Sequence, residues 1–66
     1  MQSNPLQAGN YVMVDSIDYH GYGIVEMVLH GSYVIRINGR HLRFWSHELI
    51  HLDVDEVQFK LLAAGS

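Results

Sequence analysis

The dipeptide Asn38-Gly39 constrains the fold of this chain more than any other feature of its sequence. Both residues tolerate positive φ angles, which a two-residue type I′ turn requires, and such a pair is the strongest short-range signal of a β-hairpin. On either side, over residues 33–37 and 40–46, apolar and polar side chains alternate. A period of two is typical of strands with one buried face. The sequence therefore predicts an antiparallel hairpin that reverses at Asn38-Gly39.

A two-residue turn also fixes which residues of the hairpin stand opposite one another. The predicted pairs are Ile37 with Arg40, Arg36 with His41, Ile35 with Leu42, Val34 with Arg43, and Tyr33 with Phe44. Two of these pairs are wholly apolar and share one face, which we predict to join the core. The opposite face is the first candidate contact surface, and it carries Arg36, His41, Arg43, Val34 and Trp45.

Further short strands are predicted where β-forming residues are bounded by turn residues. They cover residues 11–14, 24–30 and 50–52, and residues 46–49 are predicted to form a turn or one turn of tight helix. Residues 15–23 are predicted to be a loop, in which Gly21 and Gly23 supply unusual backbone angles. In the strand over 24–30, Val25, Met27 and Leu29 are expected to face inward, while Ile24 and Val28 leave burial on both faces as the alternative.

Residues 54–64 carry the spacing and the end signals of an α-helix. Asp53 and Glu56 match a capping box, and Gly65 suits the C-terminal cap. Apolar residues recur at helical spacing: Val54, Val57, Leu61 and Leu62. Isolated helices shorter than ~12–15 residues are marginal in water, so we expect this helix to pack against the sheet.

Short strands in a chain of 66 residues can hide a shared apolar face only if the sheet curls. We therefore expect one mainly β domain, a small barrel of about five antiparallel strands with one C-terminal helix. Residues 23–37 resemble the glycine, hydrophobic pair and hydrophobic strand of KOW and related SH3-like (Tudor-type) barrels. The expected organisation is a flexible lead-in over 1–8, the barrel over 9–53 and the helix over 54–64.

A longer resemblance is to uncharacterised short proteins of phages and mobile elements in gut Bacteroidales. The matching segments are Gln7-Ala8-Gly9-Asn10-Tyr11-Val12 and Glu48-Leu49-Ile50-His51-Leu52-Asp53, and the similarity covers roughly residues 7 to 62. This chain lacks the proline of the second segment and has Asp53 in the capping position. The resemblance implies a phage or mobile-element accessory protein, and it implies no catalytic residue.

Composition narrows the class of function. The chain has no cysteine, which excludes disulfides and thiolate metal sites. Its net charge of −3 lacks the basic excess of most nucleic-acid binders, although Arg36, Arg40 and Arg43 form a local basic stretch. No apolar run approaches a membrane span, and residues 1–5 do not resemble a secretory signal. We therefore predict no membrane association and a cytoplasmic location.

The histidines raise the question of a metal site. His47-Glu48-Leu49-Ile50-His51 fits the bare His-Glu-x-x-His pattern of metalloproteases, in which both histidines lie on one helix. Here the flanking residues predict a strand and a helix cap. We therefore interpret His47 and His51 as surface histidines and keep them only as weak metal candidates.

Two further constellations are candidate binding residues. On the face with Trp45, the side chains of Arg36, His41 and Arg43 suit a protein interface or nucleic-acid stacking; alternatively, these arginines pair with acidic groups of the same chain. Tyr19 and Tyr22 lie in the predicted first loop, where ligand contacts are common; alternatively, a tyrosine packs over the barrel mouth.

No nucleophile or phosphate-loop motif is present. The serines lack a Gly-x-Ser-x-Gly setting, and Gly21-Tyr22-Gly23 is not followed by the glycine, lysine and serine of a phosphate loop. We predict a non-enzymatic binding or assembly module without a cofactor, which acts through protein contact or self-association. The alternative is a nucleic-acid-binding or nucleotide-binding accessory factor.

Overall fold

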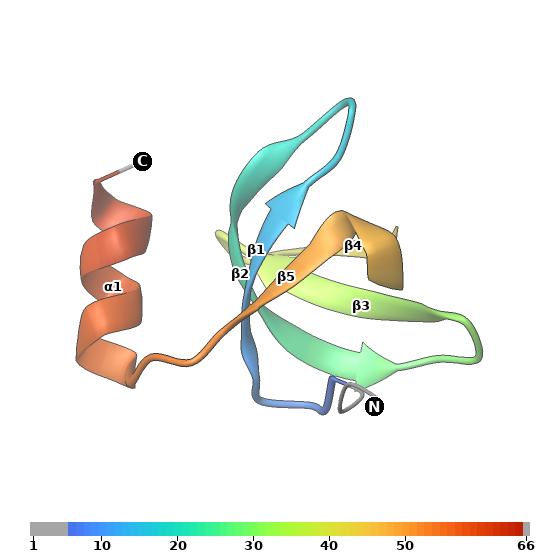
Figure 1. Cartoon of the computed structure of the whole chain (residues 1–66), viewed down its shortest axis with the longest axis horizontal. Coiled ribbons are helices and arrows are strands. Elements are labelled where there is room, and N and C mark those ends of the chain that lie inside the picture. Colours follow the sequence, from blue (N-terminus) through green and yellow to red (C-terminus); the bar gives the residue numbers. More distant parts are fainter. Residues whose placement is uncertain (1–5, 66) are drawn as a thin grey trace.

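The computed structural model describes residues 6–65 and places all their strands in one antiparallel sheet (Figure 1). The elements are β1 (Tyr11–Asp15), β2 (His20–Val28), β3 (Ser32–Ile37), β4 (Arg40–Trp45), a 3₁₀ turn (Ser46–Glu48), β5 (Leu49–Leu52) and α1 (Glu56–Ala64). The strand order across the sheet is β4-β3-β2-β1-β5. A mainly β fold with five antiparallel strands and one C-terminal helix is therefore confirmed.

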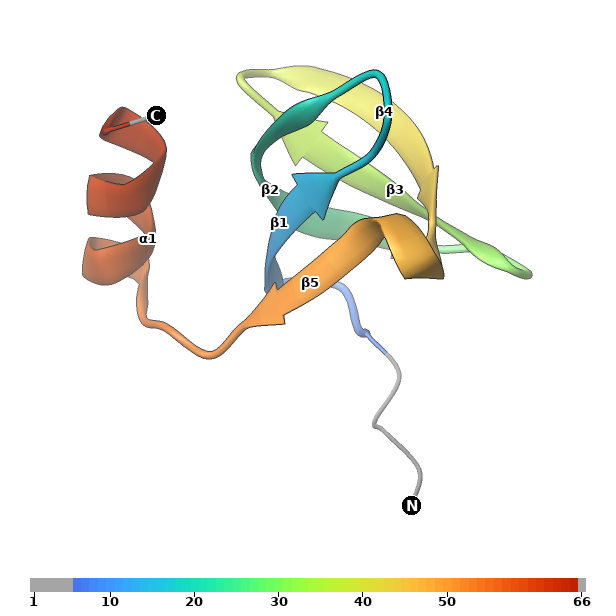
Figure 2. The same ribbon diagram turned by 45° about the horizontal axis from the view of Figure 1, so that its top comes forward.

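The sheet is strongly curled, and Figure 2 shows β3 and β4 folded over β1 and β2. Within the described part of the chain, β4 and β5 are the two edges, because each is hydrogen-bonded on one side only. The confirmed architecture is therefore an open, curled sheet. Closure into an SH3-like barrel stays a prediction.

The predicted hairpin is confirmed in its turn and its register. Asn38 and Gly39 have φ angles of 51° and 79°, as a type I′ turn requires. All five predicted residue pairs are present, and a sixth joins Ser32 to Trp45. The alternation of faces along β3 and β4 follows from this register, because successive side chains of a strand point to opposite faces.

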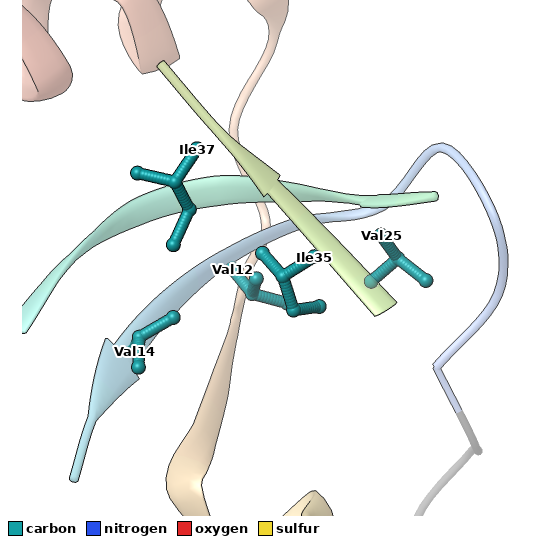
Figure 3. Close-up of a cluster of buried hydrophobic side chains, with 5 residues drawn as sticks. All are labelled: Val12, Val14, Val25, Ile35 and Ile37. Atoms are coloured by element: carbon teal, nitrogen blue, oxygen red, sulfur yellow. The ribbon is translucent and has the colours of Figure 1, made fainter. Parts of the chain in front are cut away.

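The core lies on the concave face of the sheet and comes from three strands. Figure 3 shows five side chains turned toward one another, all nearly inaccessible to water: Val12, Val14, Val25, Ile35 and Ile37. Burying one such side chain is worth about 1.5–3 kcal/mol. Around this cluster pack Leu6, Tyr19, Tyr33, Leu42, Phe44 and Leu49. Of the predicted lead-in, residues 1–5 lie outside the described residues, while Leu6 contacts the core.

Strand β2 departs from the prediction at both ends. It begins at His20 and ends at Val28, so the predicted loop over 15–23 is wrong beyond Tyr19. Gly21 and Gly23 do not use positive φ angles. Gly23 is instead needed for close packing, because a Cβ atom built on it would lie 2.5 Å from Cγ2 of Ile35.

A bulge explains why the alternation in β2 changes phase. The register with β3 pairs Val25 with Ile35 but Met27 with Val34, so Glu26 is the extra residue. A bulge leaves two residues opposite one, which reverses the faces of the residues that follow it. Met27, expected to face inward, is therefore exposed.

The helix begins two residues later than predicted. Asp55 is the N-cap: its Oδ1 accepts the N–H of Gln58 at 2.8 Å, and Gln58 Oε1 accepts the N–H of Asp55 at 3.2 Å. The capping box predicted on Asp53 is thus wrong, because the chain stays extended through Asp55. Gly65 is the C-cap, as predicted.

Helix α1 lies beside the sheet, against β2 and against Tyr11 of β1. Figures 1 and 2 show it standing apart from the body of the sheet, and among the described helical residues only Phe59 is buried. The Phe59 ring stacks on Tyr11 of β1, with ring centroids 4.4 Å apart. Val57 and Leu61, which the apolar spacing predicted to pack, are exposed.

Candidate functional site

The convex face of the hairpin carries the residues predicted to make contacts. Cross-strand neighbours share a face, so the register builds two rungs across three strands. One rung is Met27, Val34 and Arg43, and the other is Ile24, Arg36 and His41. Trp45 follows Arg43 on the same face of β4. We call the following set the hairpin face: Met27, Val34, Arg36, His41, Arg43 and Trp45.

The apolar part of the hairpin face is open to solvent. Trp45 and Met27 are each 53% exposed, and Val34, which lies between Met27 and Arg43, is half-buried. The Trp45 ring lies over the β2–β3 turn, since a Cβ atom on Gly31 would lie 3.9 Å from Cζ3 of Trp45. The backbone N–H of Trp45 donates to Glu48 Oε1 at 2.9 Å, which ties the end of β4 to the 3₁₀ turn.

The two arginines of the hairpin face have different surroundings. Arg36 Nε lies 3.1 Å from Oε1 of Glu26, so the bulge residue offsets its charge. Exposed ion pairs of this kind contribute ~0–1 kcal/mol. Arg43 has no ion pair to any residue between 6 and 65, and neither does Arg40 at the turn. The predicted alternative of internal pairing therefore holds for Arg36 and fails for Arg43.

Tyr19 and Tyr22 have different surroundings in the structure. Tyr19 packs against the core, with its ring centroid 6.0 Å from that of Phe44, as the packing alternative predicted. Tyr22 is on the convex face of β2, paired with Met13. Met13 and Tyr22 line a shallow pocket of about 460 Å³ together with Val14, Asp15, His20 and Gly21. Tyr22 thus shares a face of β2 with Ile24, one step along the strand from the rung that contains Arg36.

A second shallow pocket adjoins the edge strand β4. It has a volume of about 320 Å³ and is lined by Asp18, Tyr19, Arg40, Leu42, Arg43 and Phe44. Its apolar floor comes from the core-facing side of β4, and Tyr19 closes it from the β1–β2 loop. The sequence did not reveal this pocket, because it depends on how the loop folds back over β4.

The weak metal candidates do not form a helical pair. His47 lies in the 3₁₀ turn and His51 in β5, so the metalloprotease arrangement of two histidines on one helix is not formed. Nor do three or more histidine, aspartate or glutamate side chains gather into a metal-binding group anywhere in residues 6–65. His20 contacts Asp15 instead, with Nε2 3.0 Å from Oδ1.

Comparison with known proteins gives no family: no family model, curated protein or solved structure matches this chain. The resemblance to short phage proteins therefore stays a prediction. No helix among the described residues has the length and apolar character to cross a membrane.

Proposed function

We propose that this chain is a non-enzymatic protein-binding module that contacts its partner through the hairpin face. The observation that carries the proposal is one face with a half-exposed Trp45, a half-exposed Met27 and an Arg43 that has no ion pair within residues 6–65. Tryptophan, arginine and methionine are enriched at protein interfaces, and tryptophan and arginine dominate their binding energy. By its resemblance, the module would serve a phage or mobile element in the cytoplasm.

The charge distribution favours a protein partner over a nucleic acid. The net charge of −3 repels a polyanion at long range, and the local cations are few once Glu26 offsets Arg36. Nucleic-acid binding is the second candidate, because Arg40 and Arg43 lack ion pairs within the described residues and Trp45 offers a ring for base stacking.

Affinity capture with matched variants tests the proposal. The full chain is immobilised and exposed to native-host extract, alongside Trp45→Ser and the control Ile17→Ser. Ile17 is 99% exposed and lies outside the hairpin face, so its replacement should leave capture unchanged. We expect one protein whose recovery falls about tenfold with Trp45→Ser, a loss typical of an interface hot spot. Equal recovery by both variants would contradict the proposal.

A salt series separates the two candidates. Binding of the purified chain to single-stranded oligonucleotides that weakens steeply with added salt would favour the nucleic-acid candidate. A chain that binds no oligonucleotide at low salt, yet captures a protein through Trp45, supports the protein-binding module.

A further inference from the structure

The register of the hairpin shows which backbone groups of β4 point away from the sheet. The type I′ turn makes Ile37 and Arg40 a hydrogen-bonded pair, and hydrogen-bonded pairs alternate with non-bonded ones along an antiparallel ladder. In β4, Arg40, Leu42 and Phe44 therefore bond to β3. The backbone groups of His41, Arg43 and Trp45 are directed outward.

Of these outward-directed backbone groups, one is hydrogen-bonded within the chain, and those of His41 and Arg43 are open within the described residues. The N–H of Trp45 donates to Glu48. His41 and Arg43 make no backbone hydrogen bond to a segment outside the sheet among residues 6–65, and β4 has no neighbour on that side. Their two N–H and two C=O groups form an open strand edge, which is a template for another strand.

The two faces that flank this edge differ in chemistry. Toward the core lies the pocket described above, in which Tyr19, Leu42 and Phe44 form the apolar part of a lining that also includes Asp18, Arg40 and Arg43. Toward the convex side lies Arg43, with no ion pair in the described chain. A strand added to β4 would direct alternate side chains to these two faces.

We infer that the β4 edge binds one extended segment of a protein partner, in which apolar and acidic side chains alternate. The segment adds as a strand beside His41–Arg43, with an apolar side chain in the Tyr19 pocket and an acidic one beside Arg43. Backbone bonds give affinity in this mode, and alternate side chains give specificity. The inference rests on the proposed function and specifies the partner and its binding mode.

A second copy of this chain is a poor occupant of the edge. Pairing β4 with β4 of another copy would bring Arg40, His41 and Arg43 against one another, and like charges placed opposite are destabilising. The other edge strand, β5, contains no acidic residue. The charge at β4 therefore calls for a different chain.

Amide hydrogen exchange in the ¹⁵N-labelled full chain tests the inference. The probe is a short peptide, blocked at both ends, that alternates valine and glutamate. Saturating peptide should slow exchange at the amides of His41 and Arg43 about tenfold or more, because both become hydrogen-bonded. Exchange at Leu42 and Phe44 should change little, since those amides already bond to β3. A peptide that alternates valine and lysine, and a valine–glutamate peptide N-methylated on its bonding edge, should have no effect.

Matched variants separate the charge contribution. Arg43→Glu should weaken binding of the valine–glutamate peptide about tenfold through loss of attraction. The control Lys60→Gln removes a cation of α1 that already contacts Glu56 at 3.2 Å, and its binding should stay within about twofold. Equal binding of the valine–lysine peptide would overturn the inference. So would slowing at His41 and Arg43 produced by protein concentration alone, which would show a second copy.

The result also separates this inference from the proposed function. A peptide that perturbs Trp45 and Met27 but leaves exchange at His41 and Arg43 unchanged would overturn strand addition and leave the hairpin face as a binding surface. If no peptide binds, the inference fails, and the capture assay with Trp45→Ser decides the proposed function independently.

Discussion

Among the glycines of this chain, Gly23 is the one whose surroundings leave the least room for a side chain. It is buried in β2 opposite Val12, and a Cβ atom there would lie 2.5 Å from Cγ2 of Ile35 and 2.7 Å from Cγ1 of Ile37. Both isoleucines are core residues that are almost inaccessible to solvent. The glycine thus allows β3 to fold closely over β2.

We expect Gly23→Ala to lower the free energy of unfolding by about 1–3 kcal/mol, because overpacking of a dense core costs that much. Gly21→Ala is the matched control, since there the nearest atoms belong to the end of the Tyr19 side chain, at 3.0 Å, which can shift. Urea denaturation followed by Trp45 fluorescence measures both. A control that loses as much stability as Gly23→Ala would contradict this account.

Residue-scale chemistry also explains what the sequence could and could not show. The Asn38-Gly39 turn and its register were predictable, because turn geometry and alternation are local properties. The pairing of Arg36 with Glu26 and the exposure of Met27 were not, since both depend on a bulge that arises between strands. The role of Gly23 was likewise not predictable, because its close neighbours, Ile35 and Ile37, belong to another strand.

At the scale of elements, α1 is the least secured part of the fold. A helix of nine residues is marginal by itself, and its docking relies on the stacking of Phe59 upon Tyr11. Two aspartates could each have started it, Asp53 or Asp55, and the spacing to a polar residue three positions on fits both. In the structure the N-cap is Asp55, so the sequence spacing alone does not determine where the first turn of the helix begins.

The choice of N-cap is directly testable. Asp55→Ala should reduce the free energy of unfolding by about 0.5–2 kcal/mol and lower the helical circular dichroism, because the N–H of Gln58 loses its acceptor. Asp53→Ala, the control that removes a nearby carboxylate outside the cap, should cost less. If Asp53→Ala lowered the free energy of unfolding more than Asp55→Ala, the helix would begin after Asp53, as the sequence spacing predicted.

Loss of the Phe59 ring should undock helix α1 from the sheet, while the sheet itself stays folded. In Phe59→Ala, we expect the amides of α1 to lose protection from hydrogen exchange, while Leu42 and Phe44 keep theirs, since the sheet core contains no residue of α1. Leu61→Ala, at an exposed position of the same helix, should leave docking intact. Equal loss of protection in helix and sheet would instead show that α1 and the sheet unfold as one unit.

Over residues 6–65, the molecule is a small curled sheet with one C-terminal helix. One face of the sheet is buried, the other is partly open, and the edge strands β4 and β5 are each paired on one side only. Charged residues make up 17% of the chain, below the ~25% of an average protein, and large apolar side chains such as Trp45 and Met27 are half-exposed. A domain of this size buries only ~60% of its unfolded surface. Both features are consistent with a surface that another chain covers.

The open edge of β4 is the feature on which the binding account depends, and amide hydrogen exchange of the free protein tests it most directly. If the β4 edge is open, the rate of amide exchange alternates along β4. Exchange is slow at Leu42 and Phe44, which bond to β3, and fast at His41 and Arg43, which face solvent. Uniformly slow exchange at all four amides would contradict an open edge, because the edge would then already be covered.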